Sequence, residues 1–303
     1  MKKYEFTGET KNIDGHILHR IRALRDIYCG GWRIRAGDLG GWIESEKNLS
    51  QEGDCWAAND AAVFENALVD EDARVDGDVM VFGNARITEF ATAEWYTKIS
   101  GNAVIAGHAS VDLHAEITGN VRITGNCTVS ENARLRGNAR VDEDAQIFGN
   151  ALIDGNTHIT GHCLVDGYAR VDGDAYVGHY ASIHENAHIT QGAMIGGDVN
   201  IAGNTVIAGD AYIPEILYIR GNAKITKKDD FLTINCNASR NCTVTFYRTA
   251  DNKIGVTCTE FGFIGALDEF ELKINSMNGD DVHVEMYHLA IQMAKLKMGE
   301  IYK

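Results

Sequence analysis

The fold is decided by residues 117–153, which read ITGNVRITGNCTVSENARLRGNARVDEDAQIFGNALI. A large aliphatic residue occupies every sixth position of this stretch, from Ile117 to Ile153, and a smaller residue follows four positions after each one. The two residues just before each small one are Gly-Asn, Glu-Asn or Glu-Asp. An internal repeat of this kind predicts a β-solenoid in which each hexad supplies one short strand and one corner.

The same register continues in both directions without interruption. Stepping by six from Val63 leads to Ile225 through 28 hexads, and only Ala93 among them is not Val, Ile or Leu. The small residue and the next aliphatic lie two positions apart, so in an extended segment both side chains point to the same side. Gly, Asn and Asp tolerate left-handed backbone conformations, which places the corners at these pairs. Three hexads would close one coil, and stacked coils would form parallel sheets with neighbours about 4.8 Å apart.

This pattern resembles the hexapeptide-repeat family of left-handed β-helix proteins. The segment GGWIESEKNLSQEGDCW at residues 40–56, followed by hexads of the Gly-Asn-Ala type, is similar to the YdcK-like proteins of bacteria and their phages. The resemblance implies a left-handed parallel β-helix in a mainly β protein, and it implies no settled activity. A right-handed solenoid of the bactofilin kind is the alternative, because ordinary parallel crossovers are right-handed.

The amino-acid composition supports an ordered repeat, and the net charge narrows the classes of partner that the protein could bind. The chain has 32 glycines but only one proline, which argues against a collagen-like chain. Its hydrophobic content of 45% is too high for a disordered chain. The net charge of −15 argues against direct nucleic-acid binding, since no basic surface dominates. The same charge permits mimicry of an acidic partner.

The cysteines and the N-terminal segment indicate a cytoplasmic protein. Seven cysteines include no CxxC pair, and five residues separate Cys236 from Cys242, so we expect buried thiols in a reducing compartment and no metal site. Cys127 and Cys163 occupy small inward positions two coils apart, roughly 10 Å, which is too far for a disulfide. The opening residues, MKKYEFTGET, hold no apolar signal region, and no run is long enough for a membrane span.

We expect three domains: an N-terminal β cap over residues 1–56, the β-solenoid over 57–228 and a small C-terminal α+β domain over 229–303. Caps are expected because the open ends of a solenoid expose core and strand edges. The N-terminal cap is predicted to contain a strand pair, two turns and three plugging tryptophans. They are Tyr4–Ile13 with Ile17–Ile27 around Asp14-Gly15, turns at Gly30-Gly31 and Gly40-Gly41, and Trp32, Trp42 and Trp56. A ligand pocket lined by these tryptophans is the alternative.

The C-terminal domain is predicted to hold a hairpin and two helices. The hairpin pairs Cys242–Arg248 with Ile254–Thr259 around Asp251-Asn252. One apolar face of the first helix comprises Leu267, Phe270, Ile274 and Met277, and that helix is expected to stop at Asn278-Gly279. The second helix is lined by Met286, Leu289, Met293 and Leu296, which we interpret as core or oligomer contacts.

Catalysis has few candidate residues in this pattern. Hexapeptide-repeat proteins are often acyltransferases in which a histidine deprotonates the acceptor, and here His108, His162 and His184 are the candidate bases. The hexads run without an inserted loop that would cover an acyl carrier or exclude water, so the sequence favours a non-catalytic role. We find no Ser-His-Asp motif, P-loop or Rossmann fingerprint and expect no cofactor.

Outward positions 18 residues apart stack into columns with distinct chemistry. One face begins with cations that could bind an anion or an acidic peptide: Arg86, Arg122, Arg140 and His158. The same face then becomes apolar and is predicted to be an interface: Tyr176, Met194 and Tyr212. A neighbouring face carries an acidic column: Asp76, Glu94, Asp112 and Asp166. An ordinary solvated surface is the alternative for the cationic and acidic columns.

These features favour a cytoplasmic, non-catalytic binding or assembly protein that works as a homo-oligomer, either dimer or trimer. Its partner would be another macromolecule, such as a host protein, or an anionic small molecule. The resemblance suggests a phage or prophage origin and a counter-defence role, by masking a host protein or sequestering a signal. The first alternative is a hexapeptide-repeat acyltransferase using acetyl-CoA or another acyl-CoA. A filament-forming solenoid is disfavoured because the C-terminal domain would obstruct end-to-end stacking.

Overall fold

A computed structural model describes residues 2–214, 216–235, 243–277 and 282–299. The chain divides into two compact units, Met1–His162 and Cys163–Lys303, and each is described by itself. This division falls inside the hexad repeat, where each coil of a solenoid contacts only its neighbours. The domain boundaries at residues 56 and 228 therefore stay predictions.

The first unit opens with antiparallel strands. β1 (Tyr4–Ile13) pairs with β2 (His16–Ala23) across a turn at Asp14 and Gly15, as predicted, and β2 pairs in turn with β5 (Leu39–Ile43). Ile27 was expected in the second strand but starts β3 (Ile27–Cys29), which forms a hairpin with β4 (Trp32–Ile34) through the predicted turn at Gly30 and Gly31.

The turn predicted at Gly40-Gly41 is wrong, because both glycines lie inside β5. Neither has a positive φ. A Cβ on Gly40 would lie 2.6 Å from the Trp56 ring, and one on Gly41 would lie 2.4 Å from the Ala61 carbonyl oxygen. These glycines therefore serve close packing between β5 and the first coil.

The N-terminal strands are joined to the first coil by parallel pairing and buried polar contacts. β5 pairs with β7 (Ala62–Val63), and the Lys3 ammonium donates to the carbonyl oxygen of Cys55 at 2.8 Å. Trp42 and Trp56 are buried as predicted for plugs. Trp32 is 62% exposed, so its predicted role as a plug is wrong.

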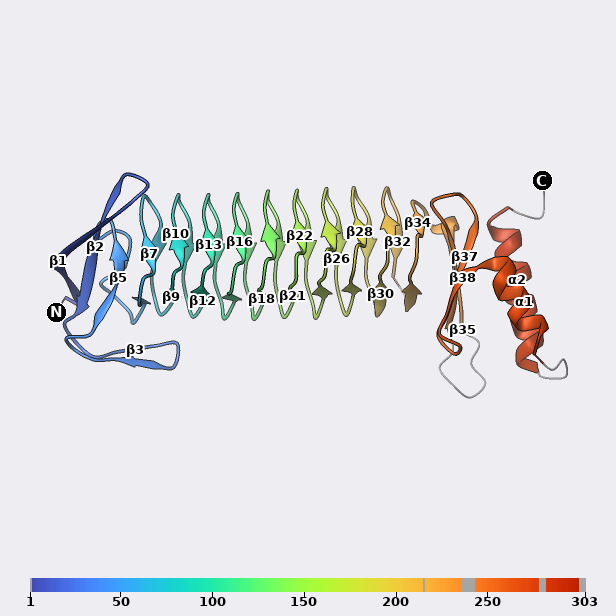
Figure 1. Cartoon of the computed structure of the whole chain (residues 1–303), viewed down its shortest axis with the longest axis horizontal. Helices are drawn as coiled ribbons and strands as arrows, with labels where there is room; N and C mark the ends of the chain where they lie inside the picture. Colours follow the sequence, from blue (N-terminus) through green and yellow to red (C-terminus); the bar gives the residue numbers. More distant parts are fainter. Residues whose placement is uncertain (1, 215, 236–242, 278–281, 300–303) are drawn as a thin grey trace. The chain divides into compact units, whose positions relative to one another are not determined.

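Three parallel sheets build the coils of the first unit, with partners 18 residues apart, such as Met80 and Lys98. Figure 1 shows β7, β10, β13 and β16 side by side. The first sheet continues from β7 through β10 (Met80–Val81), β13 (Lys98–Ile99), β16 (Glu116–Ile117), β19 (Arg134–Leu135) and β22 (Leu152–Ile153). The second holds β8 (Leu68–Val69), β11 (Arg86–Ile87), β14 (Val104–Ile105), β17 (Arg122–Ile123), β20 (Arg140–Val141) and β23 (His158–Ile159). The third holds β6 (Trp56–Ala57), β9 (Arg74–Gly77), β12 (Thr92–Trp95), β15 (Ser110–Val111), β18 (Thr128–Val129) and β21 (Gln146–Ile147).

The second unit starts with coils of the same kind. One sheet holds β25 (Arg170–Val171), β28 (His188–Ile189), β31 (Val206–Ile207) and β34 (Lys224–Ile225). Another holds β26 (Tyr176–Val177), β29 (Met194–Ile195) and β32 (Tyr212–Ile213). The third holds β24 (Leu164–Val165), β27 (Ser182–Ile183), β30 (Val199–Ile201) and β33 (Leu217–Ile219). The predicted parallel β-solenoid is thus confirmed in both units, while its handedness stays a prediction from the resemblance.

The inward positions form the core, as the repeat predicts. Every aliphatic of the series from Val63 to Ile225 is at most 1% exposed. Cys127 and Cys163 are free and fully buried, and burial raises the pKa of the Cys127 thiol to about 12. The five described cysteines are therefore inert core residues; Cys236 and Cys242 lie outside the described residues.

The corners depend on a left-handed backbone position. In every described hexad from residue 65 to residue 221, the second residue after the aliphatic has a positive φ. Glycine adopts this conformation without strain, but several corners use glutamate instead, including Glu131 at φ 63°. The Glu131 carboxylate accepts a hydrogen bond from the Gly149 amide, one coil later, at 2.9 Å. This bond compensates the strained corner, and Gln191 makes the equivalent bond to Gly209.

The second unit ends in a four-stranded antiparallel sheet. A 3-10 turn, η1 (Lys228–Asp230), leads into β35 (Phe231–Asn235), β36 (Thr243–Arg248), β37 (Ile254–Cys258) and β38 (Phe263–Ala266). The hairpin predicted from residues 242–248 and 254–259 is confirmed as β36 and β37, although Cys242 lies outside the described residues, whereas β35 and β38 were missed. Tyr247 joins this sheet to the last coils, since its buried hydroxyl donates to the Arg220 carbonyl oxygen at 2.6 Å.

Two helices cover the sheet: α1 (Leu267–Asn275) and α2 (Val282–Lys297). The predicted apolar face of α1 is confirmed, because Leu267, Phe270 and Ile274 are buried in the domain core. The predicted stop at Asn278-Gly279 lies outside the described residues. The side of α2 that packs into the same core carries Val284, Tyr287, Ala290, Ile291 and Ala294, and Met298 just after the helix packs with them.

We predict that the glutamate corners contribute to stability through their hydrogen bonds. Replacing Glu131 with Ala should lower the free energy of unfolding by about 1 kcal/mol, because a left-handed residue loses its compensating bond. Urea unfolding followed by circular dichroism measures the change. Glu131→Gln is the matched control and should retain most of the stability, since an amide oxygen can still accept. Equal losses in the two variants would contradict this role.

Candidate functional sites

The predicted cationic column lies on the second sheet of the first unit. Register places Arg86, Arg122, Arg140 and His158 on this one face, at β11, β17, β20 and β23. The Arg86 guanidinium, however, pairs with Asp70 through two nitrogens. Arg140 pairs with Asp142 at 2.8 Å. Among the described residues, Arg122 alone of the three arginines has no carboxylate at salt-bridge distance.

Asp142 is the centre of a hydrogen-bonded cluster. His158 Nε2 lies 3.1 Å from its carboxylate, beside the Arg140 contact. Burial acts to raise the pKa of Asp142, but hydrogen bonds from Thr160, His158 and Arg140 outweigh it and lower the pKa. The second unit repeats the arrangement around another carboxylate, Asp172, with Arg170, His188 and Thr190 as donors.

Most charges on these columns are therefore neutralised within the protein. In the acidic column, Arg74 pairs with both Asp76 and Glu94, and Ser130 donates to Asp112. An anion approaching the cationic column would compete with bound carboxylates except at Arg122. The anion-binding role of this column stays a prediction and is narrowed to the neighbourhood of Arg122.

The three candidate histidines differ in their surroundings. His108 stacks on Phe90, with ring centroids 4.9 Å apart. His162 is more than half exposed, and its Nδ1 lies 3.5 Å from the Asp144 carboxylate. His184 is only 20% exposed and makes two short polar contacts. Of the three, it is the one held in a defined polar arrangement.

Ser182, His184 and Asp166 form a hydrogen-bonded row on the third sheet of the second unit. The Ser182 Oγ lies 2.5 Å from His184 Nε2, and His184 Nδ1 lies 2.8 Å from the Asp166 carboxylate. No sequence motif marks this row, because the contacts arise from the stacking of coils. The three residues meet because Asp166 and His184 are 18 residues apart and stack, whereas Ser182 and His184 flank the inward Ile183.

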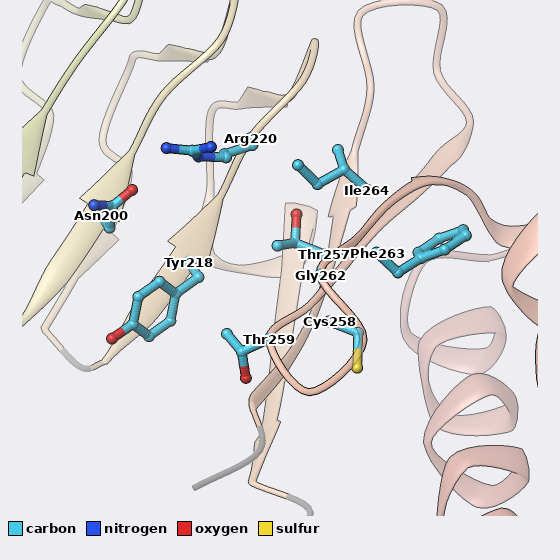
Figure 2. A pocket seen from close by; sticks show the side chains of 9 residues that line it. All are labelled: Asn200, Tyr218, Arg220, Thr257, Cys258, Thr259, Gly262, Phe263 and Ile264. Atoms are coloured by element: carbon cyan, nitrogen blue, oxygen red, sulfur yellow. The ribbon is translucent and has the colours of Figure 1, made fainter.

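A cavity of about 260 Å³ begins one coil beyond this row, and its lining residues do not include Ser182, His184 or Asp166. Ser182 is paired with Asn200 on the neighbouring strand, and Asn200 lines the cavity with Tyr218 and Arg220. Figure 2 shows these three on the solenoid strands, with Thr257 and Thr259 among the residues facing them from the C-terminal sheet. Sequence reasoning missed the cavity because no hexad predicts where β37 and β38 will pack.

The predicted apolar interface lies on the second sheet of the second unit. Tyr176 lies close against Gly178, where a Cβ would be 2.5 Å from the tyrosine hydroxyl. Met194 and Tyr212 are about half exposed. Tyr212 also lines a cavity of about 460 Å³ with Phe231. The structure thus places these side chains at the surface, and their role in an interface stays a prediction.

The outward side of α2 is a second apolar surface. Leu289, Met293 and Leu296 are 60%, 53% and 55% exposed, and Val282 is also exposed. With Met286, which is partly buried against the domain core, they follow the alternating spacing of four and three residues. We call these five residues the α2 seam. The interpretation of this stripe as domain core is wrong for the three exposed residues, because the opposite side of α2 packs into the core.

The part of the chain that the structure describes contains neither a candidate metal site nor a candidate membrane-spanning helix. No group of three or more His, Cys, Asp or Glu side chains there is placed to hold a metal ion. No helix within the described ranges has the length and apolarity required to cross a membrane.

Comparison with known proteins gives two partial matches. The Bactofilin family model, described as polymer-forming cytoskeletal, matches residues 92–192. The uncharacterized acetyltransferase YdcK of Escherichia coli (strain K12) is 35% identical over 75 residues, which cover 24% of this chain and 21% of that protein. The match thus spans about a fifth of that relative's length. The hexad repeat, the β-solenoid and both matches fit a hexapeptide-repeat β-helix protein.

We predict a pH-dependent contribution of Asp142 to stability. Because its folded pKa lies below the ordinary value of 3.8, the contribution is present above that value and is lost as pH falls through the folded pKa. Asp142→Asn should therefore lower the urea midpoint clearly at pH 7, and this difference from the unsubstituted protein should shrink as the pH is lowered below 3.8. Asp78→Asn, which removes an exposed corner carboxylate, is the charge-matched control. A loss that is independent of pH would argue against the cluster.

Proposed function

We propose that this protein is a self-assembling binding scaffold, a homo-oligomer in which the repeat presents fixed side-chain columns to a partner. The observation that carries the proposal is the α2 seam. Val282, Leu289, Met293 and Leu296 leave a large apolar stripe exposed on a helix whose other side is already packed.

A helix that is apolar on both sides is normally covered on both sides. In α2 the domain core covers one side and no described segment covers the exposed seam residues. Spacing of four and three residues is the pattern with which two helices pack side chains into each other's gaps. A second copy of α2 supplies a matching stripe of the same spacing, so self-association would bury the seam residues without another protein.

The family comparison supports the same proposal. The matching model is described as polymer-forming, and it covers residues 92–192. The filament class, disfavoured on sequence grounds, gains support from this match. An assembly through α2 would use a side of the C-terminal domain rather than end-to-end stacking, and the surface at Tyr176, Met194 and Tyr212 is a candidate for a further contact. A dimer is the simplest product of one two-helix seam.

The partner of the scaffold is proposed from charge. A net charge of −15 disfavours nucleic acid, and the unpaired Arg122 offers a point of attachment for an anionic group on a host protein or small molecule. A phage or prophage origin with a counter-defence role remains the specific form of this proposal that the resemblance suggests.

An acyltransferase is the second candidate, favoured by the printed name of the matched relative. It would use acetyl-CoA or another acyl-CoA. Native mass spectrometry of the protein purified from its own host separates the candidates. Retained coenzyme A would favour the transferase, whereas a co-purified protein or other anionic ligand would favour the scaffold.

We predict that charges in the α2 seam dissociate the oligomer. Leu289→Lys combined with Met293→Lys should convert the protein to a monomer, because charged side chains cannot be buried unpaired in an apolar helix contact. Sedimentation velocity measures the mass. Leu272→Lys on α1 is the matched control, since Leu272 is exposed outside the seam. A monomeric unsubstituted protein, or an oligomer that survives both substitutions, would exclude this seam as the interface.

A further inference from the structure

We propose that Ser182, His184 and Asp166 form a nucleophilic site that hydrolyses carboxylic esters carrying an anionic group. The three side chains are connected in the order that nucleophilic catalysis by serine requires. Oγ of Ser182 lies 2.5 Å from Nε2 of His184, and Nδ1 of His184 lies 2.8 Å from Oδ1 of Asp166. This activity goes beyond the proposed scaffold function and does not depend on it.

The two contacts assign one histidine tautomer. An ionised Asp166 can only accept, so the proton of the neutral imidazole lies on Nδ1. Nε2 is then an acceptor for the Ser182 hydroxyl and can take its proton as a general base. Asp166 positions the ring and stabilises the imidazolium formed in the reaction, whereas Ser182 is the reacting group.

This arrangement is not a general consequence of the repeat. Ser110 occupies the same hexad position twelve hexads before Ser182, yet its hydroxyl contacts the Thr92 hydroxyl at 3.3 Å. His188 also faces a carboxylate, but its contact to Asp172 uses Nε2, the nitrogen that would have to face a nucleophile. The order of serine, histidine and carboxylate is therefore a particular feature of the row at Ser182.

The neighbouring cavity can hold the substrate. Asn200 is the parallel-strand partner of Ser182, so its backbone lies about 4.8 Å away, and we assign its side-chain amide the role of donor to the oxyanion. Arg220 lines the same cavity two coils beyond His184, with the small buried Ala202 between them in the column. In Figure 2 the guanidinium of Arg220 points from its own coil toward the strand that carries Asn200.

The cavity also determines the class of ester. Its volume of about 260 Å³ suits a short acyl chain, and the hydroxyls of Tyr218, Thr257 and Thr259 supply further polar groups. Among the described residues, Arg220 has no carboxylate within salt-bridge distance, so its charge is available for a carboxylate or phosphate on the substrate. The contact of Tyr247 to the Arg220 carbonyl fixes the backbone from which this side chain extends.

The reaction proceeds through an acyl-enzyme. Ser182 Oγ attacks the carbonyl carbon of the ester while its proton moves to His184 Nε2, and the tetrahedral intermediate expels the alkoxide, which takes that proton and leaves as the alcohol. A water then attacks the acyl carbon, gives a proton to His184 and displaces Ser182 Oγ, which recovers the proton. Ester and water are consumed, and a carboxylic acid and an alcohol are formed.

Labelling and kinetics on the full chain test the site. A fluorophosphonate reagent should modify Ser182 of the unsubstituted protein, as located by peptide mass spectrometry, and hydrolysis of mono-p-nitrophenyl succinate should follow saturation kinetics. Ser182→Ala should abolish both. Asp166→Asn should lower kcat by about 100-fold or more while KM stays similar, because it removes orientation of the base and not substrate binding.

Two controls separate chemistry from folding and charge. Ser110→Ala removes the equivalent hydroxyl outside the row and should leave labelling and rate unchanged. Arg220→Ala should lower kcat/KM at least tenfold for the anionic succinate ester and leave neutral p-nitrophenyl butyrate almost unaffected. Absence of labelling at Ser182 in the folded protein, or hydrolysis retained in Ser182→Ala, would overturn the site. Equal effects of Arg220→Ala on both esters would overturn the assigned substrate class.

Discussion

The left-handed corner is the constraint on which the rest of the structure depends. Each hexad turns through one residue of positive φ, and the turn must recur every six residues for strands to stack at about 4.8 Å. Glycine meets this requirement at most corners without strain. Glutamate meets it by accepting a bond from the next corner, as Glu131 does from Gly149. A glutamate at one corner is thereby hydrogen-bonded to the backbone of the corner one coil later.

A consequence of this regularity is that inward and outward positions have separate tasks. The aliphatic series and the small residues are buried almost completely, so they carry packing and little else. Outward residues are not constrained by the core, and stacking places residues 18 positions apart next to each other. Many outward charges also pair with a carboxylate nearby on the same surface, as Arg86 does with Asp70 and Arg140 does with Asp142. The two outward residues to which we assign a binding or reacting role, Arg122 and Ser182, are not engaged in such ion pairs with any described residue.

The C-terminal domain adds what a bare repeat lacks. Its sheet supplies one wall of a cavity whose other wall is made of Asn200, Tyr218 and Arg220, which is the cover that an inserted loop would otherwise provide. Its second helix keeps one side in the domain core and presents the other as the α2 seam. The exposed helix seam and the cavity thus lie in different parts of the second unit.

The sequence by itself determined the solenoid, its register from Val63 to Ile225 and its corners, because a six-residue period constrains every coil locally. It also offered His108, His162 and His184 as candidate bases, but it gave no ground for choosing among them. Only the tertiary structure decided that Ser182 and Asp166 contact His184, that Trp32 is exposed while Trp42 is buried, and that Leu289 faces outward. These features depend on side-chain direction and on packing between distant segments, which hexad spacing does not encode.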